Sequence, residues 1–152
     1  MCTSFMGELM TATHNFGSSP TRAGATADTF KAALYLASAT INASTTAYSA
    51  TGEVSGTNYT AGGVTVTNAN APTATNSSTT AGVAYWTPSA SITYTTVTLA
   101  TAFDTVLLYN STQSNKAISV HTFGSQTITA GTFTLTMPTN STTTGLLRLA
   151  TT

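Results

Sequence analysis

Hydrophobic and polar residues alternate along several short stretches of this chain, and the alternation is its main structural signal. From Thr29 to Leu36, one parity carries Phe30 and Leu34, and the other carries Lys31. A period of two residues is typical of a half-buried β-strand. Alanine and leucine in the same stretch also suit a helix, so tertiary context decides here. The alternation predicts a strand.

The same pattern recurs downstream, between residues that favour turns. It predicts further strands at 64–67, 83–86, 92–99, 106–109, 117–123, 133–137 and 146–150. The change of parity at Thr95-Thr96 is what a β-bulge would produce. The Ala130-Gly131 pair predicts a turn. The segment 106–109 is apolar on both faces, which predicts a central, fully covered strand.

About eight short strands separated by turn signals predict an all-β fold. We expect a two-sheet antiparallel sandwich, with a jelly-roll or an immunoglobulin-like strand order. The 152 residues are the size of one domain, so a single core is expected. We expect residues 1–27 to form an N-terminal arm or short helix with a loop, and residues 28–152 to form the sandwich.

The N-terminal arm carries an amphipathic pattern over residues 3–12. Phe5 and Leu9 are four residues apart, with Met6 and Met10 beside them. This spacing predicts one short helix, which Gly7 weakens. Two interpretations are open. The segment packs on the domain's own core, or it is an arm whose apolar face docks on a neighbouring molecule.

Two long polar connections interrupt the strands. The one from Ser38 to Tyr59 carries Glu53 as its only charge. Connections of this length are uncommon in compact domains unless they bind something or pack on a partner. Gly62-Gly63 then allows a bend before the next strand. The tract from Asn68 to Gly82 is poor in hydrophobic residues and is expected to be exposed.

Charge limits the classes of partner. Only 5% of the residues are charged, four basic and four acidic, against about 25% in an average domain. Such a chain cannot neutralise many phosphates, so no nucleic-acid partner is expected. A net charge near zero favours association, which is easier to reconcile with a component of an assembly than with a free enzyme.

The chain carries no signal for a membrane or an oxidising compartment. Cys2 is the single cysteine, which excludes an internal disulfide. The N-terminus has no basic region followed by a long apolar stretch, so no secretory signal is expected. No hydrophobic run approaches the length of a membrane-spanning helix, and no membrane association is expected.

Residues that could carry catalysis are few and scattered. No HxH or HExxH spacing links the two histidines, His14 and His121, so structural or solvent-facing roles are expected for both. The carboxylates stand in turns or at segment starts, at Glu8, Asp28, Glu53 and Asp104. Paired carboxylates for glycoside hydrolysis would have to come from distant loops. We expect a non-enzymatic protein with no catalytic residue, no cofactor and no metal site.

Aromatic residues offer a second candidate site. Trp86, with Tyr85 and Tyr94 nearby, could form a platform on which a sugar stacks. Aromatic residues in alternating strands are more often core residues and cross-strand pairs. The core interpretation is therefore favoured.

Several ordered blocks give the chain a resemblance to a known family. The blocks are TFK-ALY within 29–35, TGEVSG-NYTAGG within 51–63, LLYNST at 107–112 and AGTFTLTMP at 130–138. Together with CTSFMGELMTATHNF at the N-terminus, they resemble a family of small structural proteins of tailed bacteriophages. The resemblance covers nearly the whole chain, except the tract from Asn68 to Gly82 and the loop before Asp28.

The resemblance implies a virion component, and for a β-sandwich of this size a capsid decoration or cement protein on the capsid surface. Its partner would be the major capsid protein, and it would self-associate, with a trimer favoured. Phe5, Leu9 and Met10 would be the partner-binding anchors in the N-terminal arm. The alternative is a tail, baseplate or fibre-associated protein that contacts host glycan.

Overall fold

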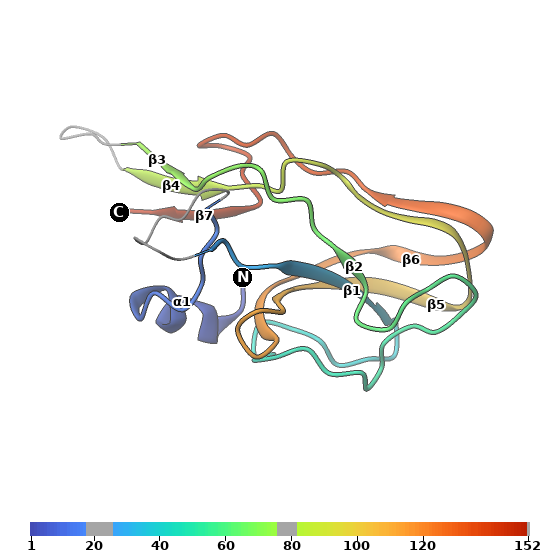
Figure 1. The fold of residues 1–152 in the computed structure, drawn as a ribbon. Helices are drawn as coiled ribbons and strands as arrows, with labels where there is room; N and C mark the ends of the chain where they lie inside the picture. The colour runs from blue at the N-terminus through green and yellow to red at the C-terminus, as the bar shows by residue number, and fades with distance from the viewer. Residues whose placement is uncertain (18–25, 76–81, 152) are drawn as a thin grey trace.

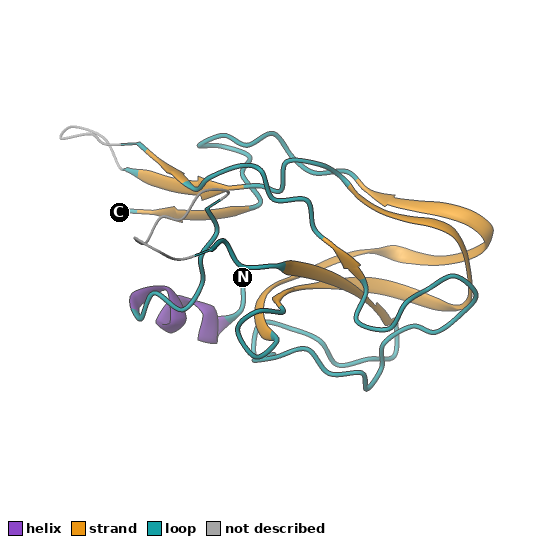
Figure 2. Cartoon of the chain, viewed as in Figure 1, coloured by secondary structure: helices purple, strands orange, loops and turns teal. Residues whose placement is uncertain are grey.

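The computed structural model describes residues 1–17, 26–75 and 82–151, and Figure 1 shows their arrangement. One short helix stands at the N-terminus, and strands and loops make up the remainder, as Figure 2 shows. In chain order the elements are α1 (Thr3–Met10), β1 (Phe30–Leu36), β2 (Val64–Thr65), β3 (Thr73–Ala74), β4 (Val83–Trp86), β5 (Ile92–Asn110), β6 (Lys116–Leu135) and β7 (Leu147–Ala150).

The strands form two antiparallel sheets. The larger has the order β2-β1-β5-β6 and the smaller, called the small sheet below, has the order β3-β4-β7. The predicted all-β fold with two antiparallel sheets and a short N-terminal helix is confirmed. The predicted helix and the strand at 83–86 match α1 and β4. β3 is exposed, as expected for the tract from Asn68 to Gly82, but no strand was predicted there; it pairs with Tyr85 and Ala84 of β4.

β5 and β6 are much longer than predicted. The segments 92–99 and 106–109 belong to one strand of 19 residues, and 117–123 and 133–135 belong to one strand of 20 residues. Figure 1 shows this hairpin curving back on itself, so that its open end lies over the sheet that its closed end forms with β1. The same two strands therefore contribute to both layers of the sandwich.

Irregularities in the β5–β6 ladder accompany this bend. The register shifts between Tyr94 and Val97, and Thr96 has a φ of 52°, so the bulge predicted at Thr95-Thr96 is confirmed. The turn predicted at Ala130-Gly131 is wrong, because β6 continues through it with Ala130 at a φ of 47°. Bulges bend and twist a strand without ending it, and strands commonly change layers at such positions.

The core lies between the two layers and is rich in aromatic rings. Tyr94 and Phe103 of β5 are almost fully buried, and the Tyr94 hydroxyl donates a hydrogen bond of 2.8 Å to the carbonyl of Ala32 in β1. At the other end, Phe30 of β1 lies 5.8 Å from the Trp86 ring of β4. These contacts join the layers through side chains.

The connection from Ser38 to Tyr59 packs on the chain's own large sheet. The Val54 N–H donates to the Leu34 carbonyl at 3.0 Å, and the Leu36 N–H donates to the Gly52 carbonyl at 2.9 Å. The chain then bends at Gly63, whose φ is 72°. A side chain at Gly63 would collide with the β1 backbone, because an added Cβ would lie 1.7 Å from the Ala32 oxygen.

Candidate interaction surface

Helix α1 is attached to the sandwich by main-chain hydrogen bonds at its start. The Cys2 N–H donates to the Ile118 carbonyl of β6, and the Thr3 N–H donates to the Ala43 carbonyl, both at 2.8 Å. The Phe5 ring is 2% exposed and lies 4.9 Å from the His14 ring. The first residues therefore pack on the chain's own core, which is one of the two arrangements considered for this segment.

A polar cluster beneath α1 holds the helix from the other side. One carboxylate oxygen of Glu8 accepts a hydrogen bond from Lys116 Nζ at 2.8 Å, and the other accepts from His14 Nε2 at 2.8 Å. Burial opposes ionisation of Glu8, but the hydrogen bonds from Lys116 and His14, together with the charge of Lys116, outweigh it and hold the pKa of the carboxyl below its usual range. The ionised carboxylate thus links α1 to β6.

Asn110 at the end of β5 determines which nitrogen of His14 carries the proton. Its amide oxygen accepts from the backbone N–H groups of Thr112 and Gln113, at 3.0 and 3.1 Å. Its Nδ2 must therefore be the atom that faces His14 Nδ1 at 3.0 Å, and it donates there. His14 Nδ1 accepts and His14 Nε2 donates to Glu8, which describes a neutral imidazole.

Asp28 completes the cluster. Its carboxylate accepts from the Asn15 backbone N–H at 2.8 Å, from Asn110 Nδ2 at 2.7 Å and from Gln113 Nε2 at 3.2 Å. The His14 side chain and Asn110 are fully buried. Among the described residues, no hydroxyl or thiol is hydrogen-bonded to His14. The hydrogen bonds of the cluster fasten the N-terminal segment to the β5–β6 hairpin.

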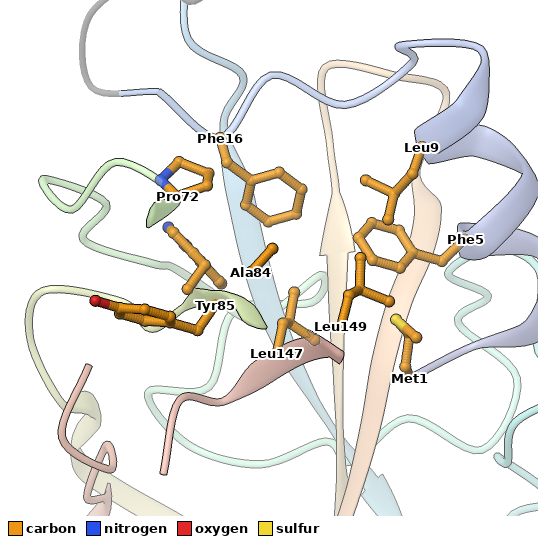
Figure 3. Close-up of a pocket in the computed structure, with 10 residues that line it drawn as sticks. Met1, Phe5, Leu9, Phe16, Pro72, Ala84, Tyr85, Leu147 and Leu149 are labelled. Carbon is orange, nitrogen blue, oxygen red and sulfur yellow. The ribbon is translucent and has the colours of Figure 1, made fainter. Parts of the chain in front are cut away.

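An apolar groove runs between α1 and the small sheet (Figure 3). Its volume is about 210 Å³, and its lining consists of Met1, Phe5, Leu9, Phe16, Pro72, Ala84, Tyr85, Trp86, Leu147 and Leu149. No charged side chain lines it. Met1 and Leu149 are 39% and 42% exposed, so the groove is open to solvent at apolar residues.

The three predicted anchors occupy different positions relative to this groove. Phe5 and Leu9 point into it from α1, as Figure 3 shows. Phe5 is buried and Leu9 is half-buried. Met10 lies outside the lining and is 90% exposed. Whether any of the three binds a partner stays a prediction.

Sequence reasoning missed the opposite wall of the groove. Phe16 follows the helix in a stretch with no periodic signal, and β7 contributes Leu147 and Leu149 from the other end of the chain. The alternation at 146–150 indicated a strand but did not indicate which strand pairs with it. The pairing of β7 with β4 brings these leucines opposite α1.

The aromatic platform is not on the surface. Trp86 and Tyr94 are each 2% exposed, and the Trp86 Nε1–H donates to Asn68 Oδ1 and to the Asn70 carbonyl, both at 3.0 Å. The core interpretation is confirmed for Trp86 and Tyr94. Tyr85 is half-buried and lines the apolar groove.

The remaining candidate residues are bonded within the fold. Glu53 accepts from the hydroxyls of Tyr48 and Tyr59 at 2.6 and 2.7 Å, and it anchors the long connection. His121 Nε2 lies 2.9 Å from Ser119 Oγ, and burial, helped by the N-terminal charge, lowers the pKa of its imidazole. Asp104 accepts from the Thr105 hydroxyl at 2.7 Å.

Within residues 1–17, 26–75 and 82–151, no three His, Cys, Asp or Glu side chains are grouped as a metal site would require. Cys2 is buried, and burial raises the pKa of its thiol. None of the helices in the same ranges has the length and apolar character needed to cross a membrane.

Fold and surface together define a small β-sandwich with a fixed N-terminal helix and an apolar groove beside it. No model of a known protein family, no curated protein and no solved structure matched the chain.

Proposed function

We propose that this protein is a structural component of a tailed-bacteriophage virion and that it decorates the capsid. In this role it binds the major capsid protein on the outer surface of the head, self-associates there, and stabilises the shell by adding buried area across subunit junctions. The ordered sequence blocks that resemble small phage structural proteins support the proposal, and so does the scarcity of charged residues.

The observation that carries the proposal is the apolar groove between α1 and the small sheet. Its occupant is an apolar segment of the major capsid protein. A pocket lined only by uncharged side chains suits a buried anchor at the centre of an interface. The wall formed by α1 is preformed, because Glu8, His14 and Lys116 hold the helix in place. Little ordering is then required when the partner binds.

The first test is the copy number in purified virions. Quantitative mass spectrometry should find about as many copies of this chain as of the major capsid protein. A ratio of a few per cent would move the protein to the tail or baseplate, and its absence would overturn the virion role. Particles that lack the chain should also lose heat resistance and retain DNA less well.

The second test addresses the groove. Purified protein is added to particles that lack it, and the bound fraction is measured. Leu149→Lys places a charge at the groove rim and should weaken binding by at least about tenfold, which is about 1.4 kcal/mol. Leu149 is 42% exposed, so the variant should still fold.

The control is Thr143→Lys, which adds the same charge at an exposed position outside the groove. It should bind as the natural protein does. If Leu149→Lys also binds normally, the groove is not the docking site. If Met10→Lys weakens binding instead, the contact lies on the outer face of α1.

A further inference from the structure

β6 is the outermost strand of the large sheet, and within residues 1–17, 26–75 and 82–151 it pairs there with β5 alone. The start of its outer side is covered by the chain itself. The Cys2 N–H donates a hydrogen bond to the Ile118 carbonyl, and the Ala117 N–H donates to the Thr46 carbonyl at 2.9 Å. Beyond these contacts, the described residues offer no backbone partner to the outer side of β6.

Hydrogen bonds on the far side of the sheet show which backbone groups of β6 face outward. The Leu34 carbonyl of β1 accepts a hydrogen bond from the Val54 N–H, so it points away from β5. Leu34 pairs with Val106 of β5, and the backbone N–H and carbonyl of Val106 therefore point away from β1 and toward β6. Val106 pairs with His121, whose backbone groups must then point back to β5. By alternation, the N–H and carbonyl groups of Val120 and Thr122 face the open edge.

From Ser119 to Thr122 the ladder is regular, and this part of the open edge lacks the devices that keep edge strands from associating. Natural proteins protect such strands with charged side chains, proline, bulges or very short length, and the bulges of β6 lie before and after these residues. Between Lys116 and Arg148 the chain has no charged residue, and its first proline after β6 begins is Pro138. A strand of 20 residues is also far longer than a typical edge strand.

A cavity adjoins the same strand. Its volume is about 330 Å³, and β6 contributes His121, Phe123, Phe133 and Leu135 to its lining. All four side chains are only half-buried. His121 and Phe123 lie before the bend of β6, and Phe133 and Leu135 lie after it. The sandwich is therefore incompletely closed along β6.

We propose that β6 pairs antiparallel with β6 of a second copy of this chain about a twofold axis. An edge that meets its own copy in this way is self-complementary, since each residue i contacts j while j contacts i. The edge carries no charged side chain from Ala117 to Leu135, so no like-charged side chains oppose each other in the pair. The other outermost strands in the described residues, β2, β3 and β7, have two to four residues and cannot match β6.

This pairing gives a twofold dimer, whereas the phage resemblance favours a trimer. It does not depend on the virion role, and the two ideas fail separately. A monomer in solution would overturn the pairing but not capsid binding. A chain that forms the dimer but is absent from virions would overturn the virion role but not the pairing.

The test is the mass of the purified chain in solution, measured by sedimentation equilibrium and native mass spectrometry. At about 100 µM, a pair with a micromolar Kd is almost fully associated. The natural chain should then show twice its 15.5 kDa mass. A monomer or a trimer at this concentration would overturn the proposal.

Substitutions at Thr122 locate the contact. Thr122→Pro removes a backbone N–H that faces the open edge, and Thr122→Lys places a charged side chain on that edge. Each substitution should raise the dimer Kd by at least about tenfold. Thr143→Lys is the matched control in an exposed loop and should leave the Kd unchanged. A dimer that survives both Thr122 variants would place the interface elsewhere.

Hydrogen exchange of the natural chain gives a measurement that needs no variant. The amides of Val120 and Thr122 should exchange quickly in dilute protein and become protected as concentration rises. The amide of His121 is already paired with β5 and serves as the internal reference. Fast exchange of Val120 and Thr122 in the dimer would exclude pairing through β6.

Discussion

Asn110 connects three segments that lie far apart in the sequence. Its amide oxygen is occupied by the turn that follows β5, so its nitrogen is left to donate to His14 and Asp28. A single side chain thereby orients an imidazole and a carboxylate. Buried networks of this kind stabilise a fold only while every member keeps its partner.

Acid should loosen this network through Glu8. The pKa of Glu8 is lower in the folded chain than in the unfolded one, where it is near 4.5. The folded state therefore gains stability from Glu8 above pH 4.5 and loses it as the pH falls through the folded pKa. Chemical unfolding between about pH 7 and pH 3 should show this loss, and Glu8→Gln should reduce it.

Lys116→Gln provides the control for this prediction. Without the ammonium group, the Glu8 carboxyl keeps its burial but loses its strongest hydrogen bond, so its pKa should rise. The acid-induced loss of stability should then begin at higher pH than in the natural chain. If both variants follow the natural profile, the pH dependence has another origin.

At the scale of elements, alternation located every described strand except β3, but not the lengths of β5 and β6. Residues 100–101 and 124–127 are exposed, and they lie where the β5–β6 hairpin bends. There neither face of the strand is buried, so no periodic pattern remains to be detected. The bulge at Thr95-Thr96 was predictable because buried residues on both sides of it record the change of parity.

The candidate surface was predictable only in part, for a related reason. Phe5 and Leu9 were predictable because they stand four residues apart in one segment, which is the spacing of one helix face. Phe16 and Leu149 join them only through the tertiary fold, and the bond between Lys116 and Glu8 spans 108 residues. Local patterns carry no information about such pairs.

Ala130 offers a test of the bulge in β6. Its φ of 47° lies in the left-handed region, which costs an alanine about 1 kcal/mol and glycine almost nothing. Ala130→Gly should therefore stabilise the chain by up to about 1 kcal/mol in thermal or chemical unfolding.

Ala100→Gly is the matched control. Ala100 is exposed in β5 and has no positive φ, so the same substitution should destabilise by about 0.5–1 kcal/mol. Opposite signs at the two positions identify backbone conformation as the cause. A destabilising Ala130→Gly would contradict the left-handed conformation of β6 at this position.

At the scale of the whole molecule, few charges remain for interactions with partners. The chain has four acidic residues, and Glu8, Asp28 and Glu53 are bonded inside the fold. Apolar contacts and backbone hydrogen bonds must then supply the free energy of association. Such contacts respond weakly to salt.

Self-association should accordingly tolerate salt. Raising ionic strength from about 0.1 M to about 1 M shortens the Debye length from about 10 Å to about 3 Å. The dimer Kd measured by sedimentation should change by less than about threefold over this range. A tenfold weakening would show that charged groups hold the copies together.

The folded hairpin also affects how the molecule carries mechanical load. At the bend, both layers of the sandwich are made of the same two strands, so a force that pulls the layers apart there acts along peptide bonds. Near α1, packing among Phe16, Phe30 and Trp86 joins the layers. Under tension, the two layers should separate first at the end near α1. At the other end they stay connected, because β5 and β6 run continuously through the bend.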